Sequence, residues 1–177
     1  MLTIDARSST LLVIDFQARL MPAIDQGTDA VANARRLIDA AAMVDVPALF
    51  TEQNPKGLGP TVPELTPDPS VLVEKMTFDA CRAPGFLERL DRDRSLVVAG
   101  CEAHVCVLQT VLGLLDRSSR VFVVRDAIGS RRPESKDAAI ARMERHGAEI
   151  VTTEMVVFEW LETAEHPRFR EAARLIR

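Results

Sequence analysis

The sequence of 177 residues predicts a single α/β domain, in which a mainly parallel sheet is covered by helices on both faces. Short apolar runs, typical of strands buried on both faces, alternate along the chain with amphipathic segments at helical spacing. A domain averages about 150 residues, so the length fits one domain spanning residues 1–177. The 47% of hydrophobic and 27% of charged residues are ordinary for a globular protein.

Composition and charge exclude several classes of function. The 22 basic and 26 acidic residues give a net charge of −4, which lacks the basic footprint of a nucleic-acid-binding protein. No apolar run approaches the roughly 18 to 20 residues that span a bilayer. The N-terminus carries no pattern of a secretion signal, and three cysteines fit free thiols in a reducing compartment. We therefore expect a cytoplasmic protein without nucleic-acid or membrane partners.

The first half of the chain is expected to hold three strands, at residues 11–14, 47–50 and 71–73. Apolar residues recur at helical spacing from Val31 to Val44. Thr28 or Asp29 could cap this helix by accepting a hydrogen bond from a first-turn amide. Residues 54–70 contain five prolines and two glycines, which predicts a long irregular loop of a kind that is usually functional or mobile.

The second half is expected to hold three more strands, at residues 96–99, 121–124 and 149–151. Gly100 is expected to stop the first of these. The segment from Val105 to Leu115 is apolar nearly all round, which indicates a buried helix. A further helix over residues 133–146 begins with a proline and stops at Gly147. The remainder of the chain is expected to be helical.

Three reactive side chains follow the predicted strand ends. Asp15 comes directly after the first strand, Lys75 two residues after the third and Cys106 seven after the fourth. Ligands of open α/β sheets bind at these carboxyl ends. Cys106 is expected in the first turn of its helix, where unpaired amides and the positive dipole end favour a thiolate. A carboxylate can accept the thiol proton, and an ammonium can stabilise the anions, so together the three predict nucleophilic catalysis.

Each of these residues also has an ordinary structural interpretation. Cys106 could be a buried small hydrophobe, Lys75 a surface lysine and Asp15 a turn or capping residue.

Other chemistry of these cysteines and histidines is weaker. Cys101, His104 and Cys106 form a C-x-x-H-x-C pattern, but structural zinc needs four ligands and the remaining Cys81 is isolated. The three histidines are expected to be solvated or satisfied rather than paired with Cys106. The G-x-G-x-x-G pattern of dinucleotide sites does not occur. We therefore expect no cofactor.

Four segments resemble motifs of the isochorismatase-like cysteine hydrolase superfamily: residues 98–110, 14–17, 75–78 and 126–131. The first, VAGCEAHVCVLQT, resembles the nucleophile motif. The next two resemble the Asp-x-Gln and Lys-x-x-Phe motifs, and the last resembles the segment after the fifth strand. The resemblance covers essentially the whole chain, and residues 51–65 look like the isochorismatase-domain-containing branch.

This resemblance implies a three-layer α/β/α domain with a six-stranded parallel sheet of order 3-2-1-4-5-6. It implies that Asp15, Lys75 and Cys106 form a catalytic triad. It further implies a cis peptide bond near Cys101 and Glu102, which would aim the backbone amides of Glu102 and Cys106 at an oxyanion.

The resemblance also assigns the pocket. Gln17 and Phe78 would line it, with Phe16 in the core. Nicotinamidases of the superfamily bind a metal through an aspartate and histidines after the second strand, but residues 52–65 contain no histidine, so we expect no metal. True isochorismatases cleave a vinyl ether and lack the nucleophilic cysteine, so Cys106 favours acyl chemistry. Most members self-associate, which implies a homo-oligomer, a dimer or larger.

The resulting hypothesis is a hydrolase of a small-molecule substrate with an amide-like C–N bond. It would act through a Cys106 acyl-enzyme, with Asp15 as base and Lys75 as electrostatic support. One alternative is a hydrolase of another small ester or ether with the same site. A second alternative, from a different class, is a catalytically silent partner-binding protein. A catalytic Cys106 is expected to react with iodoacetamide near neutral pH much faster than Cys81 or Cys101.

Overall fold

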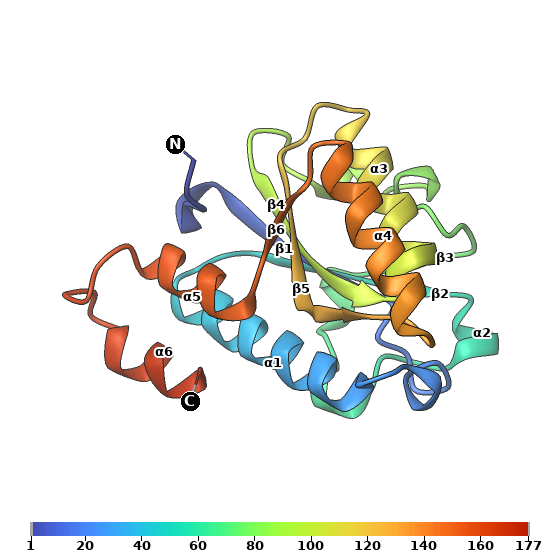
Figure 1. Ribbon diagram of the computed structural model, residues 1–177, viewed down its shortest axis with the longest axis horizontal. Coiled ribbons are helices and arrows are strands. Elements are labelled where there is room, and N and C mark those ends of the chain that lie inside the picture. The colour runs from blue at the N-terminus through green and yellow to red at the C-terminus, as the bar shows by residue number, and fades with distance from the viewer. Residues whose placement is uncertain (1, 177) are drawn as a thin grey trace.

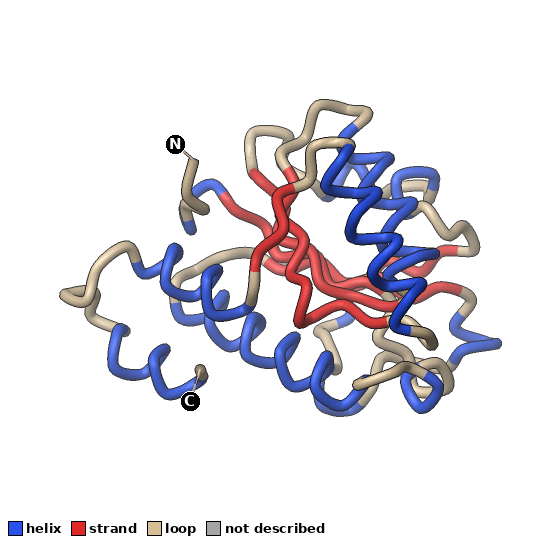
Figure 2. The backbone as a smooth tube through the Cα atoms, in the orientation of Figure 1, coloured by secondary structure: helices blue, strands red, loops and turns tan. Residues whose placement is uncertain are grey.

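A computed structural model describes residues 2–176 and contains one six-stranded sheet in the order β3-β2-β1-β4-β5-β6. All of its strand pairs are parallel. The strands are β1 Ser9–Ile14, β2 Ala48–Gln53, β3 Leu72–Lys75, β4 Ser95–Cys101, β5 Val121–Gly129 and β6 Glu149–Val151. The predicted fold class and strand order are therefore confirmed (Figures 1 and 2).

Helices cover both faces of this sheet (Figure 1). One face carries α1 Gly27–Met43, α5 Thr153–Leu161 and α6 Phe169–Leu175, and the other carries α3 Leu108–Leu115 and α4 Pro133–Arg145. A short helix, α2 Pro55–Leu58, lies in the connection from β2 to β3. Among residues 2–176, no helix combines the length and the apolar character needed to cross a membrane.

The central strand β1 shows why its sequence is continuously apolar. Leu11 and Val13 pack in the core under α1, whereas Leu12 and Ile14 pack in the core on the α3 and α4 side. Successive side chains of a strand point to opposite faces, so a strand covered on both sides must be apolar at every position. The buried run of β1 ends at Ile14, and the reactive residue Asp15 follows it directly.

The expectation that Gly100 stops the fourth strand is wrong, because β4 continues through it to Cys101. The register of β4 against β5 shifts between Val98 and Gly100, and β5 runs on to Gly129. A Cβ atom at Gly100 would lie 2.6 Å from both the Cβ and the carbonyl oxygen of Ile14. Glycine is therefore required here for the close approach of β4 to β1.

The predicted cap of the first helix is also wrong. Helix α1 begins at Gly27, so Thr28 and Asp29 lie inside its first turn. The N-cap is Gln26, in the left-handed region with φ 51°, and its side chain makes no capping hydrogen bond. Asp29 instead places a negative charge near the positive end of the helix dipole.

The long connection over residues 54–70 is more regular than predicted. It contains α2 and two 3-10 turns, Pro63–Leu65 and Pro69–Val71. The buried Glu52 carboxylate at the end of β2 accepts hydrogen bonds from the Thr61 amide at 2.6 Å and from its hydroxyl at 2.7 Å. A charged acceptor forms strong hydrogen bonds, so this contact anchors the middle of the connection to the sheet.

Candidate active site

Asp15 follows β1 directly and has a φ of 52°, a left-handed conformation that aspartate tolerates better than most residues. Its amide donates a hydrogen bond to the carbonyl oxygen of Thr51 at 3.0 Å. The Thr51 hydroxyl returns a hydrogen bond to Oδ1 of Asp15 at 2.6 Å. Thr51 thereby fixes one oxygen of this buried carboxylate.

Lys75 forms an ion pair with the second oxygen of Asp15, at 2.6 Å from Nζ to Oδ2. Both side chains are buried, with exposed fractions of 0% and 1%. The ammonium also donates to the carbonyl oxygens of Thr77 at 3.2 Å and Phe78 at 3.4 Å. A buried ion pair persists only when its remaining donors and acceptors are satisfied, and these carbonyls satisfy them.

The structure places Lys75 at the last position of β3, not two residues beyond the strand as expected. The strand extends because Lys75 continues the parallel register opposite Gln53 of β2. The carbonyl oxygen of Lys75 also accepts a hydrogen bond from the Asn54 amide at 2.8 Å. The backbone of Lys75 is therefore held by the sheet itself.

Cys106 lies in a turn of π-helix, Ala103–Val107, that leads into α3. It is buried, and it lies close enough to Asp15 for the charge of that carboxylate to act on its thiol. Burial raises the pKa of the Cys106 thiol well above its ordinary value, and the Asp15 charge raises it further. The Lys75 charge opposes these effects in part. Burial and the Asp15 charge therefore oppose the thiolate that the start of the helix is expected to favour.

The two other cysteines are also buried. Burial raises the pKa of Cys101 to about 12, and burial with the Asp79 charge raises the pKa of Cys81 to about 12. Selective alkylation of Cys106 was expected because its thiol would ionise more readily than the other two. The pKa is raised for all three cysteines, so ionisation does not distinguish Cys106. Cys81 also lies near a carboxylate, Asp79; Cys106 differs because its carboxylate, Asp15, is paired with the buried Lys75.

The peptide bond between Cys101 and Glu102 is cis, as the resemblance implied. The carbonyl oxygen of Glu102 accepts hydrogen bonds from the amides of Val105 at 3.1 Å and Val107 at 3.2 Å. The buried Glu102 carboxylate accepts from the amide and Nε of Arg131, each at 3.0 Å. These bonds tie the loop carrying Cys106 to the end of β5. The assignment of the Glu102 and Cys106 amides to an oxyanion stays a prediction.

Gln17 is fully buried, and its amide group is engaged with the backbone. Its Nε2 donates to the carbonyl oxygens of Gln53 at 3.0 Å and Gly59 at 2.7 Å, and its Oε1 accepts from the Gln53 amide at 2.9 Å. Gln17 therefore fastens the β2–β3 connection beside the site, and its predicted contact with substrate stays a prediction.

The two phenylalanines of the matched motifs differ in environment. Phe16 is buried in the core under α1, which confirms its predicted core position. Phe78 is 49% exposed, so its side chain is open to a ligand or a second protein chain. Its backbone carbonyl oxygen accepts a hydrogen bond from Lys75 at 3.4 Å, a contact that does not depend on the phenylalanine ring.

Two threonines near these groups were not predicted. Thr51 directly follows the predicted second strand, so the strand-end reasoning that found Asp15 could have found it. Thr110 is fully buried in α3, accepts a hydrogen bond from the Ala80 amide at 3.0 Å and donates to the Phe78 carbonyl at 3.5 Å. Thr110 is the last residue of the segment 98–110 that resembles the nucleophile motif, but no role for its side chain was predicted.

The histidines are satisfied locally. His104 Nδ1 lies 3.0 Å from the Ser130 hydroxyl, and His146 and His166 bond to backbone groups near them in sequence. Within residues 2–176, no group of three or more His, Cys, Asp or Glu side chains is arranged to hold a metal ion.

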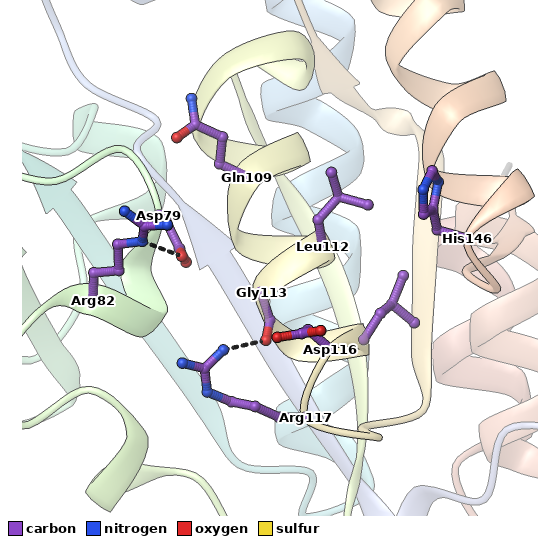
Figure 3. A pocket seen from close by; sticks show the side chains of 9 residues that line it. Asp79, Arg82, Gln109, Leu112, Gly113, Asp116, Arg117 and His146 are labelled. Atoms are coloured by element: carbon purple, nitrogen blue, oxygen red, sulfur yellow. Dashed lines mark hydrogen bonds and ion pairs between the residues drawn. The ribbon is translucent and has the colours of Figure 1, made fainter.

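An open cleft of about 630 Å³ runs along α3, with His146 among the residues that line it (Figure 3). Its walls include an ion pair from Arg82 to Asp79 at 3.3 Å, and a hydrogen bond from Arg117 to the Gly113 carbonyl at 2.6 Å. The residues lining it do not include Asp15, Lys75 or Cys106. The candidate active site is instead the nearly enclosed cluster at the carboxyl ends of β1, β3 and β4.

Comparison with known proteins matches this arrangement to a family. Residues 9–155 match the model of the isochorismatase domain. The human isochorismatase domain-containing protein 2 is 38% identical over 173 residues, which cover 96% of this chain and 83% of that protein. This confirms the resemblance to the isochorismatase-domain-containing branch.

Solved structures give the same result. The MAR1 ribonuclease of Caenorhabditis elegans superposes with a TM-score of 0.93 at 37% identity, covering 98% of this chain and 92% of that one. YcaC from Pseudomonas aeruginosa, solved with hexane-2,5-diol and covalent acrylamide, gives a TM-score of 0.82 at 26% identity, covering 99% and 96%. From the extent of these matches, the chain belongs to the isochorismatase family.

Proposed function

We propose that this protein hydrolyses a small amide-like C–N bond through an acyl-enzyme on Cys106. One observation carries the proposal: a nearly buried thiol lies close enough to a carboxylate to feel its charge, and that carboxylate is itself paired with a buried lysine. A neutral thiol beside a positioned base is a nucleophile that is activated when the substrate arrives. The small exposure of Cys106, 7%, favours a small substrate over a polymer.

The first half-reaction forms the acyl-enzyme. Asp15 accepts the Cys106 proton while Sγ bonds to the substrate carbonyl carbon, and the backbone amides of Glu102 and Cys106 stabilise the oxyanion. The C–N bond then breaks, and the proton on Asp15 passes to the departing amine. Lys75 keeps the carboxylate in place while charge moves from Asp15 to sulfur and back.

The second half-reaction clears the thioester. Asp15 accepts a proton from water, the resulting hydroxide attacks the acyl carbon, and the C–S bond breaks. The proton on Asp15 then returns to Cys106. The products are a carboxylic acid and an amine, and the side chains regain their starting protonation.

Two relatives support a reactive site, but their descriptions point to different reactions. YcaC of Pseudomonas aeruginosa carries covalent acrylamide, so that relative bonds covalently to a small amide-bearing molecule. The relative from Caenorhabditis elegans is a ribonuclease by name. RNA cleavage fits this chain less well, because its net charge is −4 and its candidate nucleophile is nearly buried.

The proposal is tested by ammonia release from a panel of small primary amides, with small esters and an RNA oligonucleotide measured in parallel. We expect turnover of an amide by the wild type, loss of turnover in Cys106→Ala, and normal turnover in Cys81→Ala, a matched change at another buried cysteine. Intact-mass analysis after treatment with p-nitrophenyl acetate should show one acetyl group on Cys106. Cleavage of RNA that survives Cys106→Ala, or failure of both turnover and acylation, would contradict the proposal.

A further inference from the structure

A polar pocket of about 500 Å³ lies between α1, β5 and the start of α4. Figure 1 shows the N-terminal end of α4 approaching α1 at the end of β5. The pocket is lined by side chains of all three elements, among them Arg36 and Asn33 of α1, Arg125 and Asp126 of β5, and Lys136 of α4. None of the residues placed in the candidate active site lines it.

Across residues 2–176, no hydrogen bond or ion pair is found for two cations of this pocket, the half-buried Lys136 and the exposed Arg125. Lys136 is half-buried, and burial lowers the pKa of its ammonium, with the nearby Arg125 charge adding to that effect. Cys101, Asp126 and Asp137 act in the opposite direction. A half-buried ammonium beside a second cation is stabilised by an anion.

The third cation is held in position by its neighbours. Arg36 donates to Oδ1 of Asn33 at 2.7 Å, and Nδ2 of Asn33 donates to the backbone carbonyl of Asp126 at 2.8 Å. The Asp126 carboxylate is engaged by Thr153, whose amide and hydroxyl donate to Oδ1 at 2.9 and 3.0 Å. Asp29 is the remaining acid of the lining. The lining therefore carries three cations and two acids, and Asp137, which also acts on Lys136, lies outside that lining.

We propose that this pocket binds a phosphate-bearing small molecule. A phosphate monoester carries a charge of about −1.5 to −2 and three acceptor oxygens near neutral pH, enough to engage several cations at once. Lysine and arginine are the side chains that recognise such groups. A carboxylate offers one charge and two oxygens, which would leave a cation unpaired. The proposal does not depend on the activity of the Cys106 site.

Isothermal titration of the full chain with inorganic phosphate, pyrophosphate and glucose 6-phosphate tests the proposal. We expect binding at one site per chain, with affinity falling as salt concentration rises. Tighter binding of glucose 6-phosphate than of inorganic phosphate would identify an organic phosphate as the ligand. The reverse order would identify free phosphate or pyrophosphate.

Variants locate the binding. Lys136→Met and Arg125→Gln should each weaken binding by about tenfold or more, whereas Lys136→Arg should retain most of it. Arg142→Gln removes the same charge from an exposed position on α4 outside the pocket and should leave affinity unchanged. Absence of binding to all three probes, or equal losses in Arg142→Gln and Arg125→Gln variants that remain folded by circular dichroism, would overturn the proposal.

Discussion

The Asp15 carboxylate and its ion-pair partner Lys75 have opposite effects on the pKa of the Cys106 thiol. The Asp15 charge raises the pKa of the Cys106 thiol, and the charge of Lys75, which is ion-paired with Asp15, lowers that pKa. The same carboxylate that keeps the thiol protonated is therefore the group that would remove its proton. When Asp15 or Lys75 is substituted, the ionisation of Cys106 and the turnover that depends on it are expected to change independently.

We expect Asp15→Asn to increase iodoacetamide labelling of Cys106 at pH 7.5 while abolishing turnover. Removing the charge lowers the thiol pKa, and a fall of one unit raises the thiolate fraction about tenfold. Lys75→Met should slow labelling, because it removes the cation that lowers the pKa. Peptide mapping by mass spectrometry measures each cysteine separately, with Cys81, whose pKa responds to Asp79 and Arg117, as the internal control. Slower labelling in Asp15→Asn would contradict this electrostatic account.

At the scale of elements, the site depends on segments that bring distant parts of the chain together. Gln17 joins the turn after β1 to the connection over residues 54–70, and the Glu102 and Arg131 pair joins the Cys106 loop to the end of β5. These bonds involve buried backbone or carboxylate groups. Buried groups left without partners cost more than the bond contributed, so the connections are expected to be sensitive to substitution.

Gln17→Ala is expected to lower the free energy of unfolding by about 2 to 3 kcal/mol, because it leaves the buried carbonyl of Gly59 and the partly buried amide and carbonyl of Gln53 unpaired. It should also expose residues 54–70 to limited proteolysis. Urea unfolding and peptide mapping of the cleavage sites measure the two effects. Gln109→Ala, the same change at an exposed position of α3, should do neither. Equal behaviour of the two variants would show that Gln17 does not hold the connection.

At the scale of the whole molecule, buried thiols link stability to alkaline pH. Burial raises the pKa of Cys101 from 9.0 to about 12, so the folded state keeps a proton that the unfolded chain loses. The stability is therefore fully present below pH 9 and is lost as the pH rises toward 12. The loss amounts to about 1.4 kcal/mol per pH unit in that window.

Urea unfolding between pH 8 and pH 11 tests this, with Cys101→Ala as the comparison. The variant should lose stability less steeply over that range than the wild type, whatever its absolute stability. Parallel slopes for the two proteins would show that Cys101 does not titrate as its burial predicts.

We also predict that the chain forms a dimer or a larger homo-oligomer. Met76 and Phe78, next to Lys75 in sequence, are 70% and 49% exposed, an apolar surface that a second chain would cover. Size-exclusion chromatography with light scattering should give at least twice the 19.5 kDa of one chain. A mass of one chain at micromolar concentration would rule out the oligomer.

The strand pattern was predictable because it depends on local sequence. The apolar runs around Leu11, Val97 and Phe122 read as buried strands, and they are. Strand ends were less predictable, since β4 and β5 extend through a register shift that only the pairing of the two strands reveals. The cap of α1 was missed for a similar reason, because Gln26 takes a left-handed conformation without a side-chain bond.

By itself, the sequence determined the α/β class, the six strands and the placing of Asp15, Lys75 and Cys106 at or after strand ends, because hydrophobic periodicity and chain order are local properties. Only the tertiary structure decided that Asp15 and Lys75 meet at 2.6 Å, that Thr51 bonds the same carboxylate and that the Cys106 pKa is raised. These depend on burial and on charges distant in sequence, and electrostatic interactions act through the distances that folding sets.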